Sequence, residues 1–256
     1  MKAFAAGLLA LFLALTGCAS EPVDSPPAGA TVVTVIGAIH GQHRRSEAYS
    51  LDMLRRAIVK FDPDFVLVEL PPDRFATASA NFDSYGEVRE SRADDFPELT
   101  DVVFPLRKQL GFKMIPVAAW TADIAANRRA TEKRLSQDPA RAKDWADHQA
   151  AKKAYGRAVA GRSDDPQFIH SAAYDAAVRA RQETYERLFG DDLGAGGWRA
   201  INEAHLSNIN AALDGVTGQE KRVLILFGAW HKYKIVEALA ARPDLFLVDP
   251  VPLFEP

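Results

Sequence analysis

Two histidines follow the same short pattern near opposite ends of the chain. "VIGAIH" ends at His40 and "LFGAWH" ends at His231, so each histidine lies three residues after a glycine, Gly37 or Gly228. Both patterns close runs of apolar residues that are typical of buried strands. A third such run, "FVLVEL", carries Glu69 near its end. Ligands of open parallel sheets bind outside the carboxyl ends of the strands, so we expect His40, Glu69 and His231 along one edge.

Two neutral imidazoles and one carboxylate suit a divalent metal ion such as Mn²⁺, Co²⁺ or Zn²⁺, with positions left for water or substrate. A bound metal would lower the pKa of its water and polarise a carbonyl group, which is a route to hydrolysis. The chain has no His-Glu-x-x-His zinc helix and no Gly-x-Ser-x-Gly elbow. We therefore predict His40, His231 and Glu69 as metal-binding and catalytic residues. Each histidine taken alone could instead bind a loop carbonyl.

The residues around these three offer further candidates. Arg74 follows in "ELPPDRF" and could pair with Glu69 or bind an anionic substrate group, although Glu69 could also cap a helix. His43, three residues after His40, is a candidate extra ligand, and a loop role is the simpler interpretation. Asp123 could complete the site, and N-cap duty for the next helix is the alternative.

Two aromatic residues flank the second histidine of the pattern. Trp230 and Tyr233 lie next to His231 in sequence and could line a pocket or belong to the core. The remaining histidines fall in charged, helical segments, where surface or packing roles are expected: His148, His170 and His205.

The elements that must position these residues alternate between strand and helix. An apolar strand at 31–38, a helix at 46–60 and a strand at 65–70 form a βαβ unit, so the two strands should be parallel. The pattern then predicts a helix at about 97–110, a strand at 112–119, helices throughout 121–214, a strand at 222–229, a helix at 232–241 and a strand at 245–250. The predicted class is α/β, with a mostly parallel central sheet flanked by helices and an inserted all-helical block at about 121–214.

The first 17 residues indicate an export signal, with Lys2 before the apolar stretch "AFAAGLLALFLAL". That stretch is too short for a membrane-spanning helix, which needs about 20 residues. The closing "LTGC" resembles the lipobox of bacterial lipoproteins. The resemblance implies cleavage before Cys18 and acylation of that cysteine, for instance with palmitate. Since no aspartate follows Cys18, it also implies a lipid anchor in the periplasmic face of the outer membrane.

Residues 18–30 are rich in proline and small residues and indicate a flexible tether, followed by a single domain over 31–256. Cys18 is the only cysteine, so the domain has neither a disulfide nor a thiolate nucleophile. Removing Lys2 with the signal leaves 30 basic against 34 acidic residues, a net charge of −4. An acidic balance argues against a nucleic-acid partner.

The motifs together resemble the TraB/PrgY/GumN–TIKI superfamily, whose relatives include ChaN-like lipoproteins and erythromycin esterase-like enzymes. "VIGAIH", "DPDFVLVELPPDRF" and "LFGAWH" carry the likeness, which is strongest over 32–75 and 222–249. It implies functional roles for His40, His231, Glu69 and Arg74. "WRAINEAHLSNINAAL" resembles a late helix of the family that often bears an arginine near its start. Here Asn202 occupies that place, unless Arg199 takes the part.

In that superfamily, TIKI members are implicated as metal-dependent proteases, ChaN-like members as haem binders and esterase-like members as hydrolases. The first prediction for this chain is therefore a metal-dependent hydrolase of the cell envelope that acts on peptides, with Arg74 stabilising the oxyanion. The alternative is a lipoprotein that binds haem or another small ligand without catalysis, with tyrosine or histidine as axial ligands. A scaffold with a decayed site is a third interpretation. The sequence predicts no oligomeric state.

Overall fold

A computed structural model of the chain describes residues 26–91 and 93–255. The predicted signal, Cys18 and most of the predicted tether lie outside the described residues. Within the two described ranges, no helix is both long and apolar enough to cross a membrane.

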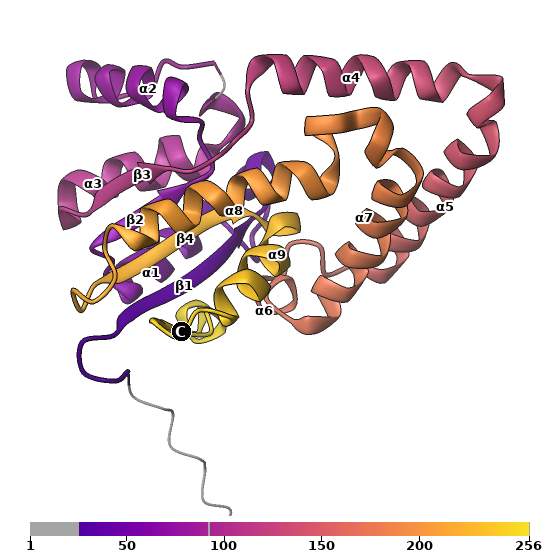
Figure 1. Ribbon diagram of the computed structural model, residues 1–256. Helices are drawn as coiled ribbons and strands as arrows, with labels where there is room; N and C mark the ends of the chain where they lie inside the picture. The colour runs from indigo at the N-terminus through magenta and orange to yellow at the C-terminus, as the bar shows by residue number, and fades with distance from the viewer. Residues whose placement is uncertain (1–25, 92, 256) are drawn as a thin grey trace, which may run out of the picture.

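A five-stranded, all-parallel sheet forms the centre of the molecule, with strand order β3-β2-β4-β1-β5 (Figure 1). The strands are β1 Thr31–Ala38, β2 Phe65–Val68, β3 Lys113–Pro116, β4 Arg222–Gly228 and β5 Leu245–Leu247. β4 lies between β1 and β2, and its last residue, Gly228, is in register with Ala38. The predicted α/β class is confirmed. The three strands that precede His40, Glu69 and His231 are neighbours.

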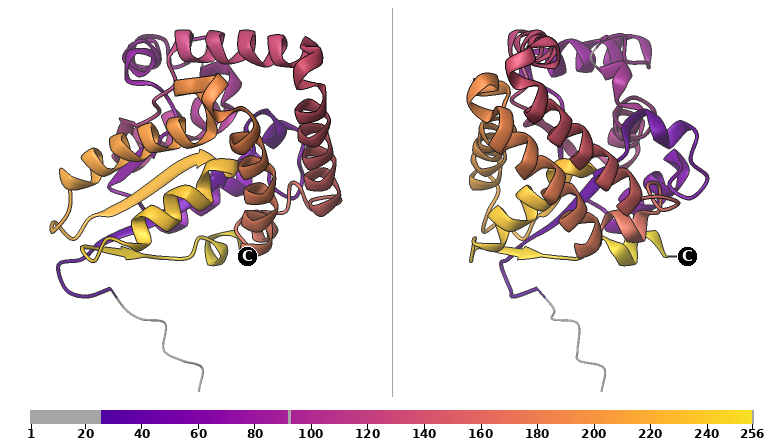
Figure 2. Two further views of the ribbon diagram at one scale, coloured as in Figure 1. Left: turned by 45° about the vertical axis from the view of Figure 1, so that its right-hand side comes forward. Right: turned by 90° about the vertical axis from the view of Figure 1, so that its right-hand side faces the viewer.

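Helices cover both faces of the sheet and extend beyond its carboxyl edge (Figure 2). The α-helices of the described ranges are α1 Leu51–Phe61, α2 Pro72–Tyr85, α3 Phe104–Leu110, α4 Ala122–Gln137, α5 Ala142–Ala158, α6 Pro166–Ile169, α7 Ala172–Leu193, α8 Trp198–Asp214 and α9 Ala229–Ala240. A π-helix spans Glu98–Val103 and runs directly into α3.

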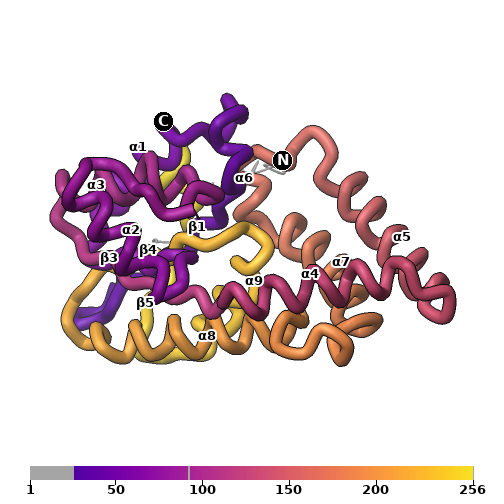
Figure 3. Tube along the Cα trace, turned by 90° about the horizontal axis from the view of Figure 1, so that it is seen from above, coloured from indigo at the N-terminus to yellow at the C-terminus, as the bar shows by residue number. Residues whose placement is uncertain are grey.

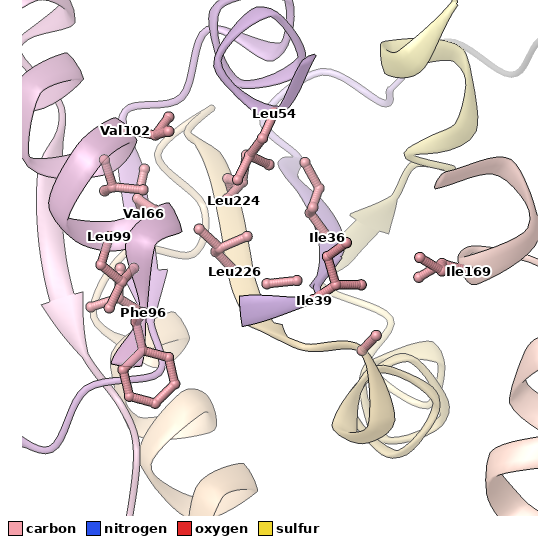
Figure 4. Packing of buried hydrophobic residues seen from close by; sticks show 14 of the residues in the cluster. Ile36, Ile39, Leu54, Val66, Phe96, Leu99, Val102, Ile169, Leu224 and Leu226 are labelled. Atoms are coloured by element: carbon pink, nitrogen blue, oxygen red, sulfur yellow. The ribbon is translucent and has the colours of Figure 1, made fainter. Parts of the chain in front are cut away.

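The apolar runs of the strands are explained by burial on both sides. One face of the sheet packs against α1 and the π-helix: Leu54 lies beside Leu224, and Leu99 and Val102 lie beside Val66 (Figure 4). The other face packs against α8 and α9, through a second cluster that includes Val35, Ile225, Phe227, Ile209 and Ile235. Strands of parallel sheets that are buried on both faces have continuous apolar sequences, which is why the apolar runs located them.

The predicted helical block is confirmed. Helices α4, α5 and α7 extend away from the carboxyl edge of the sheet, and α8 returns along one face (Figures 1 and 3). α5 packs along α7 for much of its length, and α7 contacts both α8 and α9. Side-chain N-caps fix where two of these helices begin: Thr121 accepts a hydrogen bond from the Ile124 N–H, and Ser171 accepts one from the Tyr174 N–H.

Some element boundaries differ from the predictions. The helix predicted at 46–60 begins only at Leu51, because Ser50 is its N-cap. Helix α2 was not predicted; Pro72 occupies its first position, where a missing N–H carries no cost. α9 begins at Ala229, directly after β4, rather than at 232. His231 therefore lies in the first turn of a helix and not in a loop after the strand.

Candidate functional site

The carboxyl edge of the sheet brings the two histidines of the repeated pattern and Glu69 together. Gly228 lies between them: a Cβ atom there would sit 2.6 Å from His40 Nε2 and 3.1 Å from Glu69 Oε2. Gly37 is also required by a close approach, because its Cβ would sit 3.0 Å from the Ala229 Cα. The glycine before each histidine thus permits close packing.

His40 is held between two carboxylates. Its Nδ1 lies 2.7 Å from Glu98 Oε1, and its Nε2 lies 3.9 Å from Glu69 Oε2. The ring also meets the edge of Phe96, with centroids 4.8 Å apart. His40 has a φ of 49°, in the left-handed region that residues other than glycine rarely adopt. Because a carboxylate accepts hydrogen bonds, Nδ1 is the nitrogen that donates to Glu98, and Nε2 faces Glu69.

Glu98 is a residue of the site that the sequence analysis missed. Its side chain is buried, and its second carboxylate oxygen, Oε2, has no hydrogen-bond partner within the described residues. It begins the π-helix, a rare conformation that is frequent at functional sites. The available signal was an acid inside "FPELTDVVF", where the neighbouring apolar residues indicate burial.

Glu69 is buried beside the N-terminus of α9. Its Oε2 accepts a hydrogen bond of 2.6 Å from the N–H of Gly228, the residue before the first turn. The positive end of the helix dipole favours a carboxylate there. Arg74 contacts Glu90 at 3.4 Å and Asp73 at 3.5 Å.

Arg74 lines a hollow of about 320 Å³ that also involves Trp120 and Arg129, separate from the cavity beside His40. One interpretation of "ELPPDRF" predicted that Arg74 pairs with Glu69. Among the described contacts, Arg74 instead binds Glu90. The structure therefore gives Arg74 no contact with the histidines.

His231 is buried and neutral. Its Nδ1 lies 2.8 Å from Asn202 Oδ1, and the Asn202 amide donates to the Trp198 carbonyl at 2.6 Å, which fixes the orientation of the amide. His231 therefore carries its proton on Nδ1 and a lone pair on Nε2. Burial lowers the pKa of His231 well below its usual value, and nearby histidines lower it further. The Trp198 ring stacks on the imidazole, with centroids 4.7 Å apart.

The late helix that the sequence singled out is α8, and Asn202 is the residue that it contributes. Arg199 is exposed and lies 3.6 Å from Glu186, on the outside of the helix. Arg199 thus does not take the part of an arginine in the site, and Asn202 contacts His231 instead.

His205 is a second buried histidine beside the site. Its Nδ1 accepts a hydrogen bond of 2.9 Å from the Ala119 N–H, and its ring lies edge-on to that of His231 at 5.1 Å. Burial lowers the pKa of His205 to about 4. Its Nε2 has no partner within the described residues. Of the two roles predicted for His205, packing is confirmed and a surface position is wrong.

His43 has a structural role. Its Nε2 accepts from the Ile39 N–H at 3.0 Å, and its Nδ1 donates to the Tyr49 carbonyl at 2.8 Å. Burial lowers the pKa of His43. Both ring nitrogens are committed to the backbone, so His43 orders the turn that carries His40 and is not placed as a ligand.

His170 and Tyr49 hold the backbone of Gly37. The Gly37 N–H donates to His170 Nε2 at 2.9 Å, and the Tyr49 hydroxyl donates to the Gly37 carbonyl at 3.0 Å. His170 Nδ1 donates to the Pro166 carbonyl, and burial lowers the pKa of His170 to about 3. His170 thus connects the helical block to β1.

Three other candidates lie outside the site. Tyr233 is buried and its hydroxyl accepts from Trp198 Nε1 at 3.0 Å, so it belongs to the core and not to the pocket. Asp123 is exposed in the first turn of α4, and the N-cap is Thr121. His148 is buried among aromatic rings of the helical block, which confirms packing and not surface.

A cavity of about 510 Å³ opens beside the two histidines. Trp230 lines it and is 36% exposed, in agreement with its predicted place in the pocket. Its lining also includes His40, Arg45, Tyr155, Tyr174 and His231.

The described residues do not form a ligand set for a metal ion. No group of three or more His, Cys, Asp or Glu side chains is arranged to hold one there. Two donors at about 2.1 Å from a tetrahedral ion lie about 3.4 Å apart. His40 Nε2 and Glu69 Oε2 are 3.9 Å apart, and Glu69 Oε2 already accepts from Gly228. The predicted divalent metal stays a prediction.

Comparison of the chain with models of protein families, with curated proteins and with solved structures finds no match. The resemblance to the TraB/PrgY/GumN–TIKI superfamily and the lipoprotein signal stay predictions.

Proposed function

We propose that the chain is a hydrolase of ester or peptide bonds in which His40 is the general base. The observation that carries the proposal is the position of the imidazole between two buried carboxylates, with Nδ1 on Glu98 and Nε2 facing Glu69. A histidine that a carboxylate orients through Nδ1, with Nε2 turned toward the place of proton transfer, is the arrangement of a general base.

The gap between His40 and Glu69 suits a water molecule. Two acceptor atoms 3.9 Å apart can both hydrogen-bond to one water at about 2.8 Å from each. Glu69 would hold one proton of this water while His40 Nε2 takes the other, and the water oxygen attacks the carbonyl carbon. The Glu98 carboxylate stabilises the positive charge that His40 then acquires.

The N-terminus of α9 is the group best placed for the negative charge on the carbonyl oxygen. Gly228, Ala229, Trp230 and His231 all line the cavity, and among the described residues no side chain makes a capping hydrogen bond to the first turn beyond Gly228. Backbone N–H groups of a first helical turn and the helix dipole stabilise an oxyanion. This gives α9 the role that the sequence had assigned to Arg74. When the tetrahedral intermediate collapses, His40 Nε2 returns its proton to the leaving group.

His231 positions the substrate in this proposal. Because its proton is on Nδ1 and donated to Asn202, its Nε2 can only accept a hydrogen bond. A peptide N–H or a hydroxyl group of the substrate is a matching donor. Asn202 is a positioning residue that keeps His231 in this tautomer.

The metal prediction has its own test. Mass spectrometry of the purified chain, and of a His40→Ala, His231→Ala double variant, measures bound Mn, Co and Zn. Near-stoichiometric metal in the parent, lost in the folded variant, would support a metal site. No metal in either protein, even after incubation with all three ions, would count against it.

Haem binding without catalysis is the second candidate, because His40, Tyr155 and Tyr174 line the same cavity. Burial raises the pKa of Tyr174, which disfavours the phenolate that an axial ligand would need. A shift of the Soret band during haem titration that is lost in His40→Ala would support this candidate. The absence of a shift at micromolar haem would count against it.

The hydrolase is tested on the purified full-length chain in detergent. A panel of nitrophenyl esters and fluorogenic peptides is assayed with chelator and with added Mn²⁺, Co²⁺ or Zn²⁺. We expect turnover that falls at least ~100-fold in His40→Gln, the usual contribution of a general base. Arg44→Gln is the matched control, because Arg44 pairs with Asp101 and does not line the cavity. No turnover of any substrate, or equal rates in parent and His40→Gln, would overturn the proposal.

A further inference from the structure

The described lining of the cavity beside His40 carries one positive charge and no negative charge to balance it. Among the described residues that line it, Arg45 is the only side chain with a permanent charge, and none is an aspartate or glutamate. The neighbouring Arg44 is paired with Asp101 at 3.1 Å. Asp164, next to the lining residue Ser163, accepts a hydrogen bond from Ser46 at 2.8 Å. Within the described residues, no carboxylate lies at ion-pair distance from the Arg45 guanidinium, which is exposed.

An aromatic wall forms another side of the same cavity. Trp230 Nε1 donates to the Tyr155 hydroxyl at 2.9 Å, and the two rings meet edge to face at 5.7 Å. The Tyr155 hydroxyl lies 3.4 Å from that of Tyr174, and the Arg181 guanidinium lies 3.9 Å from the centre of the Trp230 ring. The partly exposed indole is therefore fixed in place before any ligand arrives. Rigid aromatic side chains of this kind contribute contact area to a ligand at a low cost in conformational entropy.

The size of the cavity limits what it accepts. A volume of about 510 Å³ lies within the range of sites for small molecules. A guanidinium recognises a planar carboxylate through paired hydrogen bonds. The cavity thus combines one anion-binding group, an apolar aromatic wall and the proton-transfer groups described above.

We propose that the cavity takes acylated amino acids or short peptide ends with a free carboxylate, which binds Arg45, and an apolar or aromatic group, which packs against Trp230 and Tyr155. As a statement about the substrate class, this inference rests on the proposed hydrolase. The cleaved bond would lie between these two contacts, near His40. A neutral amide or ester in place of the carboxylate would lose the contact with Arg45.

Isothermal titration of the full-length chain tests the inference with three probes. N-benzoyl-phenylalanine carries the carboxylate and the aromatic groups, its amide lacks the charge, and N-acetyl-glycine lacks the aromatic groups. We expect N-benzoyl-phenylalanine to bind at least ~10-fold more tightly than either of the others, as one lost charged or aromatic contact predicts. In Arg45→Gln the preference over the amide should disappear, and in Arg44→Gln it should persist.

Equal affinities for the acid and the amide would overturn the inference, as would the absence of binding by all three probes. An equal loss of preference in Arg44→Gln and Arg45→Gln would also overturn it, because it would show a general effect of surface charge. Titration of His40→Gln separates the two proposals. If both the parent and His40→Gln prefer the acid over the amide and neither hydrolyses it, the hydrolase proposal is wrong and the carboxylate site stands. If the parent hydrolyses substrates but binds the acid and the amide equally, the carboxylate site is wrong and the hydrolase proposal stands.

Discussion

His40 combines backbone strain with a central position in the site. A left-handed conformation costs a residue other than glycine about 1–2 kcal/mol. The neighbouring His43, whose ring nitrogens bind the Ile39 N–H and the Tyr49 carbonyl, holds the turn in this shape. Strained residues persist where the surrounding structure over-determines them, and they gather at functional sites. The strain at His40 is therefore consistent with a catalytic role.

Replacing His40 with asparagine should separate stability from activity. Asparagine tolerates positive φ, so His40→Asn should unfold at the same or a higher urea concentration than the parent, while hydrolysis falls at least ~100-fold. His43→Asn is the contrasting variant, because it loses two backbone hydrogen bonds and should be less stable by about 1–3 kcal/mol. Urea titrations and turnover assays measure both. A His40→Asn variant that keeps full activity would contradict the role of the imidazole.

Glu98→Gln tests the carboxylate behind His40. The glutamine carbonyl can still accept from Nδ1, but it no longer stabilises an imidazolium ion. We expect kcat to fall by about 100-fold with little change in KM, since the loss affects the transition state more than substrate binding. Glu90→Gln, whose carboxylate caps Ala93 and contacts Arg74, is the control for loss of a buried acid. Equal effects of the two variants on kcat would point to a purely structural role for Glu98.

At the scale of elements, the junction of β4 with α9 sets the geometry of the site. The helix follows the strand without a loop, so its uncapped N-terminus, Glu69 and His40 converge on Gly228. Gly37, on the neighbouring strand β1, likewise lacks a side chain and so lets α9 approach β1. The two glycines differ in what a side chain would meet. At Gly37 it meets backbone, and at Gly228 it meets the ends of two side chains.

This difference predicts opposite consequences for two alanine variants. In Gly37→Ala the added Cβ meets the Cα of Ala229 at 3.0 Å, and backbone cannot yield, so stability should fall by about 1–3 kcal/mol. In Gly228→Ala the His40 ring can move aside, so stability should change less while hydrolysis falls. Gly156→Ala, in open space on α5, is the control and should be stabilising. Urea unfolding and activity distinguish the three. A Gly228→Ala variant with full activity would contradict the proposed contact of Gly228 with a catalytic His40.

The sequence could predict the strands and their shared edge, because strands buried on both faces are continuous apolar runs with few alternatives. For the same reason it could place His40, Glu69 and His231 at that edge, where His40 and His231 line the cavity. It could not predict the π-helix or the role of Glu98, since no periodic pattern distinguishes a buried acid that serves a histidine from one in an ion pair. The tautomer of His231 also stayed beyond reach, because it depends on Asn202, a contact made only by the folded chain.

At the scale of the whole molecule, buried histidines make stability depend on pH. The pKa values of His170 and His205 are lowered by burial to about 3 and about 4. The unfolded chain, with ordinary values near 6.5, binds more protons below that pH, so stability is full above pH 6.5 and falls as the pH drops toward 4. Each of the two should contribute a loss of about 2 kcal/mol between pH 6.5 and 5.

Urea unfolding at pH 7.5 and pH 5 measures this loss, which is large beside a usual stability of about 5–15 kcal/mol. His205→Asn keeps an acceptor near the Ala119 N–H and removes one titrating group, so its loss should be smaller by about 2 kcal/mol. Equal stability of the parent at the two pH values would refute the contribution of these histidines.

The contacts of His170 and Tyr49 with Gly37 also bear on how copies of the molecule meet. β5 pairs with β1 only over Thr31–Val33, and the chain leaves that edge after Val248 binds Val33. The Gly37 N–H and carbonyl would otherwise be an open template for a strand from another chain, the usual route to edge-to-edge aggregation. An imidazole and a phenol occupy those two groups. The same two side chains that order the strand before His40 thus occupy Gly37, in the part of this sheet edge that β5 leaves unpaired.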